Sequence, residues 1–242
     1  LALLTTKKIN RARELLLLHK DILAQISQYY DIQPRFIVAI WGLETNFGQY
    51  LGKFHTPMAL ATLAYDGRRG EFFRNELFNA LQIIDEGHIS VDDMYGAWAG
   101  AIGQVQFLPS SFLNYAQDWD KDGRKDIWSN EQDVFASIAY YLKSMGWRAD
   151  VTWGRQVLLS EKTDFSNLAE NKKRLNLREW EKLGVRNMDG HELPTRNLEA
   201  RLITSTTSDL AFLGYSNFDC ILKWNRSIYF ASSVGLLSDA LR

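Results

Sequence analysis

The sequence has few cysteines and histidines, which build disulfide scaffolds and zinc sites, and it has no apolar run long enough for a membrane span. Its 242 residues include one cysteine, Cys220, which can form no disulfide within the chain and is expected to pack in the core. The four histidines are scattered without ligand spacing, which argues against a zinc hydrolase; they are His19, His55, His88 and His191. The longest leucine run, 15–18, is too short to cross a bilayer.

The charges nearly cancel, and no targeting segment is visible. The formal net charge is -1, so the basic excess typical of nucleic-acid-binding proteins is missing. The chain opens without an export signal. Because it also begins without methionine, we expect it to be a mature or trimmed form.

What the sequence does have is apolar residues and tryptophan. A hydrophobic content of 46% in 242 residues can bury a sizeable core, in one domain or in one with a small insertion. Eight tryptophans are many for this length. Burial is the ordinary explanation for each of them, and stacking on carbohydrate is the functional one.

One carboxylate stands out at the end of an apolar helix. Pro34 suits a first helical position, and the apolar residues that follow predict a helix over 34–46. Glu44 follows Ile37 and Ile40 by seven and four positions, so it points the same way as the buried stripe. Burial raises the pKa of a carboxyl group, which lets it act as a general acid near neutral pH. The alternative is a glutamate that swings out to water.

Residues 96–111 combine three glycines with two amides. Gly96, Gly100 and Gly103 allow a backbone to come close to another element or to a ligand. Apolar walls with a few fixed amides, here Gln104 and Gln106, suit a neutral polar ligand such as a sugar. The alternative is a tight crossing of two helices with both glutamines in water.

Together these segments resemble the membrane-bound lytic transglycosylase B family, glycoside hydrolase family 103. The resemblance keeps its order and spacing over residues 34–235. It covers residues 44–48 (Glu-Thr-Asn-Phe-Gly), 61–63, 68–72, 99–103, 106–110, 122–123, 127–128, 146–147 and 225–227. It implies a mainly α (α+β) fold with a lysozyme-like catalytic core.

The family resemblance implies cleavage of the β-1,4 bond between N-acetylmuramic acid and N-acetylglucosamine in peptidoglycan, without water, to leave a 1,6-anhydromuramyl end. Glu44 would act first as acid and then as base. A two-carboxylate glycosidase needs a second acid about 5–9.5 Å away. The nearest downstream acids, Asp66 and Glu71, stand beside Arg68 and Arg69, where ion pairing is expected.

The resemblance also implies partners and a location. The glycan strands of peptidoglycan are the partner, no cofactor is required, and association with cell-wall synthesis proteins is left open. Members of the family are exported, often as outer-membrane lipoproteins, so a periplasmic location is implied, with a lipid anchor as an option in the precursor.

A substrate groove can be carried over from the family residue by residue; it comprises Arg68, Arg69, Gln106, Trp224, Asn225 and Phe230. Guanidinium groups suit carboxylates, amides suit sugar hydroxyl and N-acetyl groups, and aromatic faces stack on sugar rings. The alternatives are solvated arginines and a Phe230 that belongs to the core. The chain departs from some family members, with Ala97 in place of a serine and with Phe72, Trp224 and Phe230 where tyrosines occur.

An aspartate-rich segment resembles the start of an EF-hand calcium loop. Asp118, Asp120 and Asp122 stand at positions one, three and five, and glycine follows. Position twelve is Ser129 rather than glutamate, and Asp133 could supply the missing carboxylate. The expectation is therefore a structural calcium site on these four aspartates. The alternative is a turn held by the neighbouring lysine and arginine side chains.

Turn signals divide the chain into four segments. Residues 1–33 are an N-terminal helical segment with one helix over 7–29, and 34–148 are the catalytic core. Further helices are expected over 71–86, 111–117 and 131–145. Residues 149–207 read as a small β-containing insertion with one helix near 177–183, and 208–242 as C-terminal helices over 218–223 and 228–241 that complete the core and groove.

Three functions remain open on the sequence. The first is the lytic transglycosylase, with a muramidase-type hydrolase as its close variant. The second is a peptidoglycan-binding protein with weakened catalysis, which the departure at Ala97 and the missing tyrosines make conceivable. The third is a calcium-responsive structural module built on the loop that begins at Asp118.

Overall fold

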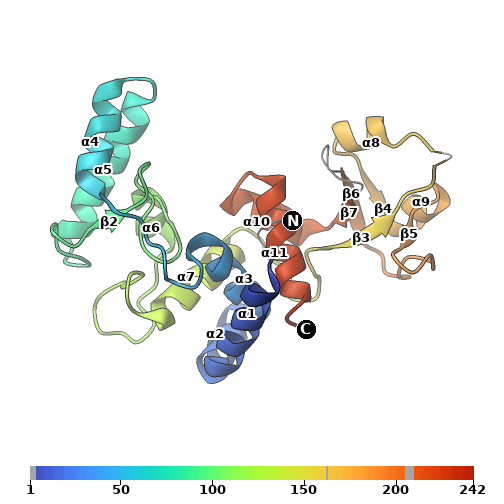
Figure 1. Cartoon of the computed structure of the whole chain (residues 1–242), viewed down its shortest axis with the longest axis horizontal. Helices are drawn as coiled ribbons and strands as arrows, with labels where there is room; N and C mark the ends of the chain where they lie inside the picture. Colours follow the sequence, from blue (N-terminus) through green and yellow to red (C-terminus); the bar gives the residue numbers. More distant parts are fainter. Residues whose placement is uncertain (1–3, 162, 205–209) are drawn as a thin grey trace. The chain divides into compact units, whose positions relative to one another are not determined.

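A computed structural model describes residues 4–161, 163–204 and 210–242, and its internal contacts divide the chain into two compact units. The first unit runs up to Ser144 and also includes Leu236–Arg242, while the second is Met145–Gly235. Figure 1 shows both units, with most of their helices and strands labelled. The mixture of helices with small sheets confirms the predicted mainly α, α+β class.

The first unit is helical apart from one very short strand pair. Its helices are α1 Thr6–Leu18, α2 Lys20–Tyr30, α3 Pro34–Thr45, α4 Thr56–Asp66, α5 Gly70–Asp85, α6 Pro109–Tyr115 and α7 Glu131–Ser144. Strands β1 Phe54–His55 and β2 Tyr95–Gly96 pair antiparallel. The last helix of the chain, α11 Ile228–Asp239, ends in this unit.

Helix α3 lies in the centre of the first unit's core. Pro34 occupies its first turn, as predicted, and every residue from Phe36 to Gly42 is buried. Its neighbours α1 and α7 pack against it. Asn46 ends the helix in the left-handed conformation, at φ 52°. The predicted helix 34–46 is therefore confirmed to within one residue.

The single helix predicted over 7–29 is wrong in one respect. The chain forms two helices that meet at His19, where the backbone leaves the helical conformation at ψ 18°. The imidazole ring packs edge-on against Phe135 and Trp41, with ring centroids 5.2 and 6.0 Å apart. The break is accompanied by packing of this half-buried ring against two core side chains, which the apolar spacing alone did not indicate.

Helix α4 was not predicted from the sequence. It is apolar on several sides, so it lacks the one-sided pattern that marks a surface helix. Only Thr56 and Leu60 are buried, and α4 packs along α5 (Figure 1). Met58 and Tyr65 remain exposed.

The second unit is built on a five-stranded antiparallel sheet with strand order β4-β6-β7-β3-β5. The strands are β3 Gly154–Leu158, β4 Arg174–Asn176, β5 Arg186–Asn187, β6 Glu199–Thr204 and β7 Ala211–Gly214. In the centre of the sheet Leu202 of β6 pairs with Leu213 of β7. The helices of this unit are α8 Ser166–Glu170, α9 Leu177–Lys182, α10 Ser216–Trp224 and the first part of α11.

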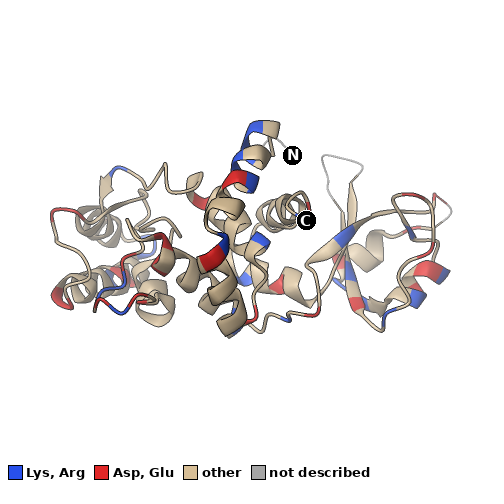
Figure 2. Ribbon diagram, turned by 90° about the horizontal axis from the view of Figure 1, so that it is seen from below, with Lys and Arg blue, Asp and Glu red and all other residues tan. Residues whose placement is uncertain are grey.

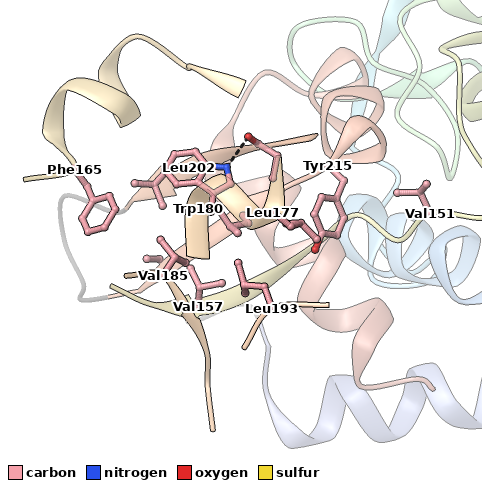
Figure 3. Close-up of a cluster of buried hydrophobic side chains, with 12 residues drawn as sticks. Val151, Val157, Phe165, Leu177, Trp180, Val185, Leu193, Leu202 and Tyr215 are labelled. Atoms are coloured by element: carbon pink, nitrogen blue, oxygen red, sulfur yellow. Dashed lines mark hydrogen bonds between the residues drawn. The ribbon is translucent and has the colours of Figure 1, made fainter. Parts of the chain in front are cut away.

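The core of the second unit gathers around Trp180 of α9 (Figure 3). The Trp180 indole is fully buried and donates its N–H to the carbonyl of Ala200 at 3.0 Å. Phe165, Leu202 and Tyr215 belong to the same cluster. The predicted β-containing segment with a helix near 177–183 is thus present, and α9 is that helix.

The boundaries of the two units differ from those of the four predicted segments. The second unit contains the expected insertion 149–207, whose last residues lie outside the described part of the chain, and it also takes in α10. The reason is packing, because Phe218 of α10 and Phe212 of β7 both contact the ring of Trp153. Among the described residues, none of the helices combines the length and apolar character needed to cross a membrane.

Candidate active site

Glu44 is the next-to-last residue of α3 and lies partly exposed at the end of an otherwise buried helix. The two residues after Thr45, Asn46 and Phe47, both have left-handed backbones, at φ 52° and 63°. Such conformations cost energy in residues other than glycine and persist where the surroundings impose them. A constrained turn therefore follows directly on Glu44.

Thr45 fixes this turn from inside. Its hydroxyl accepts the N–H of Gly48 at 3.0 Å and donates to the carbonyl of Gln104 at 2.9 Å. The Thr45 side chain is buried. The end of α3 is consequently tied to the glycine-rich segment at the residue next to Glu44.

Gln104 makes the second connection between these two segments. Its Oε1 accepts the indole N–H of Trp41 at 2.7 Å, and its Nε2 donates to the carbonyl of Trp128 at 3.0 Å. The residue is only 6% exposed. Of the two amides in this segment, Gln104 therefore has a structural role, because it is buried and both ends of its amide bind protein groups.

The close approaches expected at the glycines are present. A Cβ on Gly100 would lie 2.4 Å from the side chain of Leu60, and one on Gly103 would lie 2.6 Å from that of Ile127. Both glycines have left-handed backbones, with φ values of 88° and 67°. Close packing at both glycines therefore fixes the backbone of this segment, and with it the position of Gln106.

Gln106 is half-buried and left-handed, at φ 51°. Its Nε2 donates to the carbonyls of Leu51 and Gly103, at 3.1 and 3.0 Å. Within the described residues no donor reaches its Oε1. The amide is thus held by its nitrogen and presents an oxygen that can accept a hydrogen bond.

Arg68 and Arg69 precede α5 and are both exposed. Arg68 pairs with Asp66 at 3.3 Å, which confirms the expected ion pair, although the 92% exposed arginine makes it a weak one. The Arg69 guanidinium lies over the ring of Phe72, 4.1 Å from its centroid. Glu71 is exposed and forms no ion pair among the described residues, so the pairing expected for it is absent. Both arginines therefore remain accessible to an anionic group.

The other three predicted groove residues belong to the second unit. Trp224 is the last residue of α10 and is half-buried, while Asn225 is exposed and its Oδ1 accepts the N–H of Ser227 at 3.1 Å. Phe230 keeps only 9% of its surface exposed. The structure thus groups Glu44, Arg68, Arg69 and Gln106 in one unit and Trp224, Asn225 and Phe230 in the other.

The aspartate loop follows α6. Oxygen atoms of Asp118, Asp120 and Asp122 all lie within 4.8 Å of one another. Asp118 accepts the N–H groups of Asp122 and Gly123 at 3.2 and 2.9 Å. Three converging carboxylates are the oxygen donors that calcium prefers, so the residues present fit that ion.

Asp133 has a different role from the expected fourth ligand. Its two oxygens accept the N–H groups of Trp119 and Asp126, both at 2.7 Å, and it lies outside the converging group. The side chain is fully buried, and this burial raises the pKa of its carboxyl group to about 6. Asp133 therefore stabilises the loop by binding its backbone N–H groups, and it does not join the three converging carboxylates.

A buried carboxylate that sequence reasoning missed lies in the same unit. Glu76 of α5 accepts the backbone N–H and the hydroxyl of Ser110 at 2.8 and 2.6 Å. Ser110 is in the first turn of α6, where N–H groups lack partners within the helix. The apolar spacing around α5 was a usable signal, because it places Glu76 in line with the buried Phe73 and Ala80.

Comparison with known proteins places these features in a family. Residues 2–239 match the family model described as a transglycosylase SLT domain. Membrane-bound lytic murein transglycosylase B of Escherichia coli (strain K12) is 38% identical over 130 residues, which are 53% of this chain and 36% of that protein.

Two solved structures are similar over nearly the whole chain. SltB3 of Pseudomonas aeruginosa, in complex with NAG-anhNAM-pentapeptide, is 40% identical with a TM-score of 0.95, over 99% of this chain and 64% of that one. Slt35 of Escherichia coli, in complex with calcium, is 27% identical with a TM-score of 0.84, over 99% of this chain and 76% of that one. The chain thus spans about a third of transglycosylase B and just under two thirds of SltB3.

Proposed function

Since this chain belongs to the family of transglycosylase SLT domains, we propose that it cleaves the β-1,4 bond between N-acetylmuramic acid and N-acetylglucosamine in peptidoglycan and closes a 1,6-anhydromuramyl end. Glu44 is the acid and base of this reaction. The observation that carries the proposal is the partly exposed Glu44 carboxyl at the end of buried α3, on a turn fixed by Thr45.

One carboxyl group is sufficient for both proton transfers. Glu44 protonates the glycosidic oxygen as the bond breaks, and the N-acetyl group of the substrate stabilises the cation at the anomeric carbon. The resulting carboxylate then takes the proton of the muramyl C6 hydroxyl, whose oxygen closes the anhydro ring. The proton gained in the second step restores the acid, so no water enters the product.

A fixed acid is the main requirement of this chemistry. General acid catalysis needs the carboxyl group within hydrogen-bond reach of the glycosidic oxygen. The hydroxyl of Thr45 and the amide of Gln104 tie the end of α3 to the glycine-rich segment. Because Gln106 belongs to that same segment, its free oxygen and Glu44 are held by one connected framework.

The exposed or half-buried residues carried over from the family are proposed to contact glycan on each unit by itself. On the first unit, Arg68 and Arg69 meet carboxylates and Gln106 holds a hydroxyl or N-acetyl group. On the second unit, Asn225 offers an amide and Trp224 an aromatic face, whereas Phe230, only 9% exposed, is assigned to the core. The complex of the related SltB3 with NAG-anhNAM-pentapeptide supports this ligand class. Its anhydro sugar is the kind of end group that the proposed reaction leaves.

Calcium is proposed as a structural ion on Asp118, Asp120 and Asp122. The support is the convergence of their oxygens within 4.8 Å and the calcium complex of the related Slt35. Bound there, the ion would neutralise three carboxylates that otherwise repel one another. The periplasm is the proposed location, because peptidoglycan lies there; a lipid anchor in the precursor belongs to the same proposal.

The direct test is digestion of purified peptidoglycan followed by mass spectrometry of the products. We expect 1,6-anhydromuropeptides from the native chain and none from Glu44→Gln, whose amide can neither donate an acidic proton nor accept one. Glu170→Gln, an exposed glutamate of α8, is the matched control and should digest as the native chain does.

Three other outcomes would contradict the proposal. Reducing muramyl ends in place of anhydro ends would make the chain a hydrolase. Turnover by folded Glu44→Gln would rule out Glu44 as the acid, while strand binding without any product from the native chain would make it a binding protein.

A further inference from the structure

The first unit contains a polar cavity that the proposed reaction does not use. It has a volume of about 650 Å³ and lies between the first turns of α1 and the turn that follows α3. Lys7, Lys8, Arg11 and Glu14 line it from α1, and Asn46 and Tyr50 line it from the other side. All of these residues belong to one unit.

The cavity carries a net positive charge in a chain whose formal net charge is -1. Among the described residues, Lys7 has no ion-pair partner, and Lys8 Nζ donates to a neutral group, the carbonyl of Gly42, at 3.0 Å. Arg11 pairs with Glu14 at 3.2 Å, and the two side chains are 48% and 67% exposed. Three cations therefore face a single carboxylate, and Figure 2 shows the blue segments of α1 beside the N-terminus.

The position of these cations is unfavourable for the helix itself. The first turn of a helix has a partial positive charge, which favours acidic residues there and disfavours lysine. The first turn of α1 has no acidic residue and contains Lys7 and Lys8. Burial also lowers the pKa of Lys8, and no carboxylate offsets that effect.

Packing explains Lys8 but not the other two cations. Lys8 bonds to the Gly42 carbonyl in the last turn of α3, and the remaining contact of α1 with the core is made by its buried residues Ala12 and Leu15. Lys7 and Arg11 are exposed and line the cavity, and only Arg11 has a carboxylate partner, Glu14. The excess charge of Lys7 and Arg11 over Glu14 is best explained by an anionic ligand.

The opposite wall of the cavity starts two residues after Glu44. Asn46 and Tyr50 belong to the constrained turn, in which the Tyr50 N–H donates to the Thr45 carbonyl at 3.0 Å. The Asn46 amide donates to Gln49 at 2.7 Å, and the ring of Tyr50 is 70% exposed. A ligand in the cavity would thus touch the segment that holds the acid.

We propose that this cavity binds the carboxylates of the peptide stem carried by the glycan strand that the chain cleaves. The inference rests on the proposed function, which brings a strand with lactyl-linked peptides to this unit. Ammonium and guanidinium groups form charge-assisted hydrogen bonds to carboxylates, and an exposed tyrosine and an asparagine amide suit the peptide groups between them.

The test compares two substrates prepared from one batch of glycan strands, one with its stem peptides and one stripped of them by an amidase. The measured quantity is the ratio of kcat/KM on peptide-bearing strands to kcat/KM on bare strands. Lys7→Gln/Arg11→Gln should lower this ratio about two- to fivefold for each cation removed. The double control Lys20→Gln/Arg74→Gln, with two exposed cations elsewhere in the unit, should keep the native ratio.

A binding measurement separates this proposal from the proposed function. Calorimetry with a free stem peptide should give heat with the native chain and with Glu44→Gln, and much less with Lys7→Gln/Arg11→Gln. Loss of turnover in Glu44→Gln with stem binding intact supports both proposals. Turnover without stem binding would overturn the cavity alone, and stem binding without turnover would overturn the reaction alone.

Two further results would overturn the cavity proposal. One is an unchanged substrate ratio in Lys7→Gln/Arg11→Gln, with its fold verified by a native melting temperature. The other is binding of the native chain to vesicles rich in anionic phospholipid, lost in the double variant, without heat from the stem peptide. That result would assign the cations to a membrane surface.

Discussion

Trp41 donates its indole N–H to Gln104 Oε1 at 2.7 Å, and this buried hydrogen bond joins the helix that ends beside Glu44 to the glycine-rich segment. Trp41 lies three residues before Glu44, on one turn of α3. Gln104 in turn donates to the Trp128 carbonyl. The acid, the glycine-rich segment and the chain after the aspartate loop are therefore connected through one amide.

Removal of that amide should cost both stability and activity. Gln104→Leu keeps the volume but leaves the Trp41 N–H and the Trp128 carbonyl without partners. A buried polar group left unpaired costs about 1–3 kcal/mol, so urea unfolding should show a loss of that order or larger. Activity should fall further than the folded fraction does, because the end of α3 is released. Gln25→Leu, at an exposed position of α2, should unfold as the native chain does.

Glu76 should prove a structural acid. In Glu76→Gln the amide nitrogen would face one of the two donors of Ser110, the N–H or the hydroxyl. Hydrogen bonds to charged groups contribute about 1.5–3 kcal/mol, so the melting temperature should drop clearly. Glu71→Gln on the same helix is exposed and should change the free energy of unfolding by less than about 1 kcal/mol. Equal melting of the two variants would refute this role for Glu76.

Asp133 should make stability depend on pH in the mildly acidic range. Burial raises the pKa of its carboxyl group from 3.8 to about 6, so between these values the folded chain holds a proton that the unfolded chain has released. The stabilisation from this group is fully present below about pH 4 and is lost as the pH rises through about 6. Chemical unfolding of the native chain and of Asp133→Asn should be measured at several pH values. The difference between their free energies of unfolding should shrink as the pH rises from about 4 to about 6.

Calcium should stabilise the chain through the aspartate loop. A ligand that binds only the folded state at a hundred times its dissociation constant adds about 2.7 kcal/mol. Thermal melting should therefore shift upward with calcium in the native chain and not in Asp122→Ala, which has no side-chain oxygen to bind the ion. Asp189→Ala, in a turn of the second unit, should shift with calcium as the native chain does. An unchanged melting temperature in the native chain would leave the loop without a metal.

The sequence predicted those features that depend on local spacing. The helix over 34–46 follows from Pro34 and the apolar repeat, and α3 ends one residue earlier. The helix over 131–145 appears as α7, ending at Ser144. The close approaches at Gly100 and Gly103 were also expected, since glycine removes the side chain that would prevent them.

Features that depend on contacts between distant residues could not be predicted in this way. The break at His19 accompanies the packing of its ring on Phe135, more than a hundred residues away. The roles of Gln104 and Asp133 depend on which N–H groups lie nearby after folding, and a sequence pattern shows only that an amide or a carboxylate is present. For Gln104 and Asp133 the sequence indicated a candidate residue but not the group to which it bonds.

The sheet of the second unit ends in very short strands on both sides. Strand β4 at one edge has three residues and β5 at the other has two. The unpaired N–H and carbonyl groups of an edge strand are a template on which another chain can add a strand, and shortening the edge removes most of that template. Even at high concentration, copies of this chain should therefore have little tendency to aggregate by pairing the edges of their sheets, although the central strands β6 and β7 are apolar.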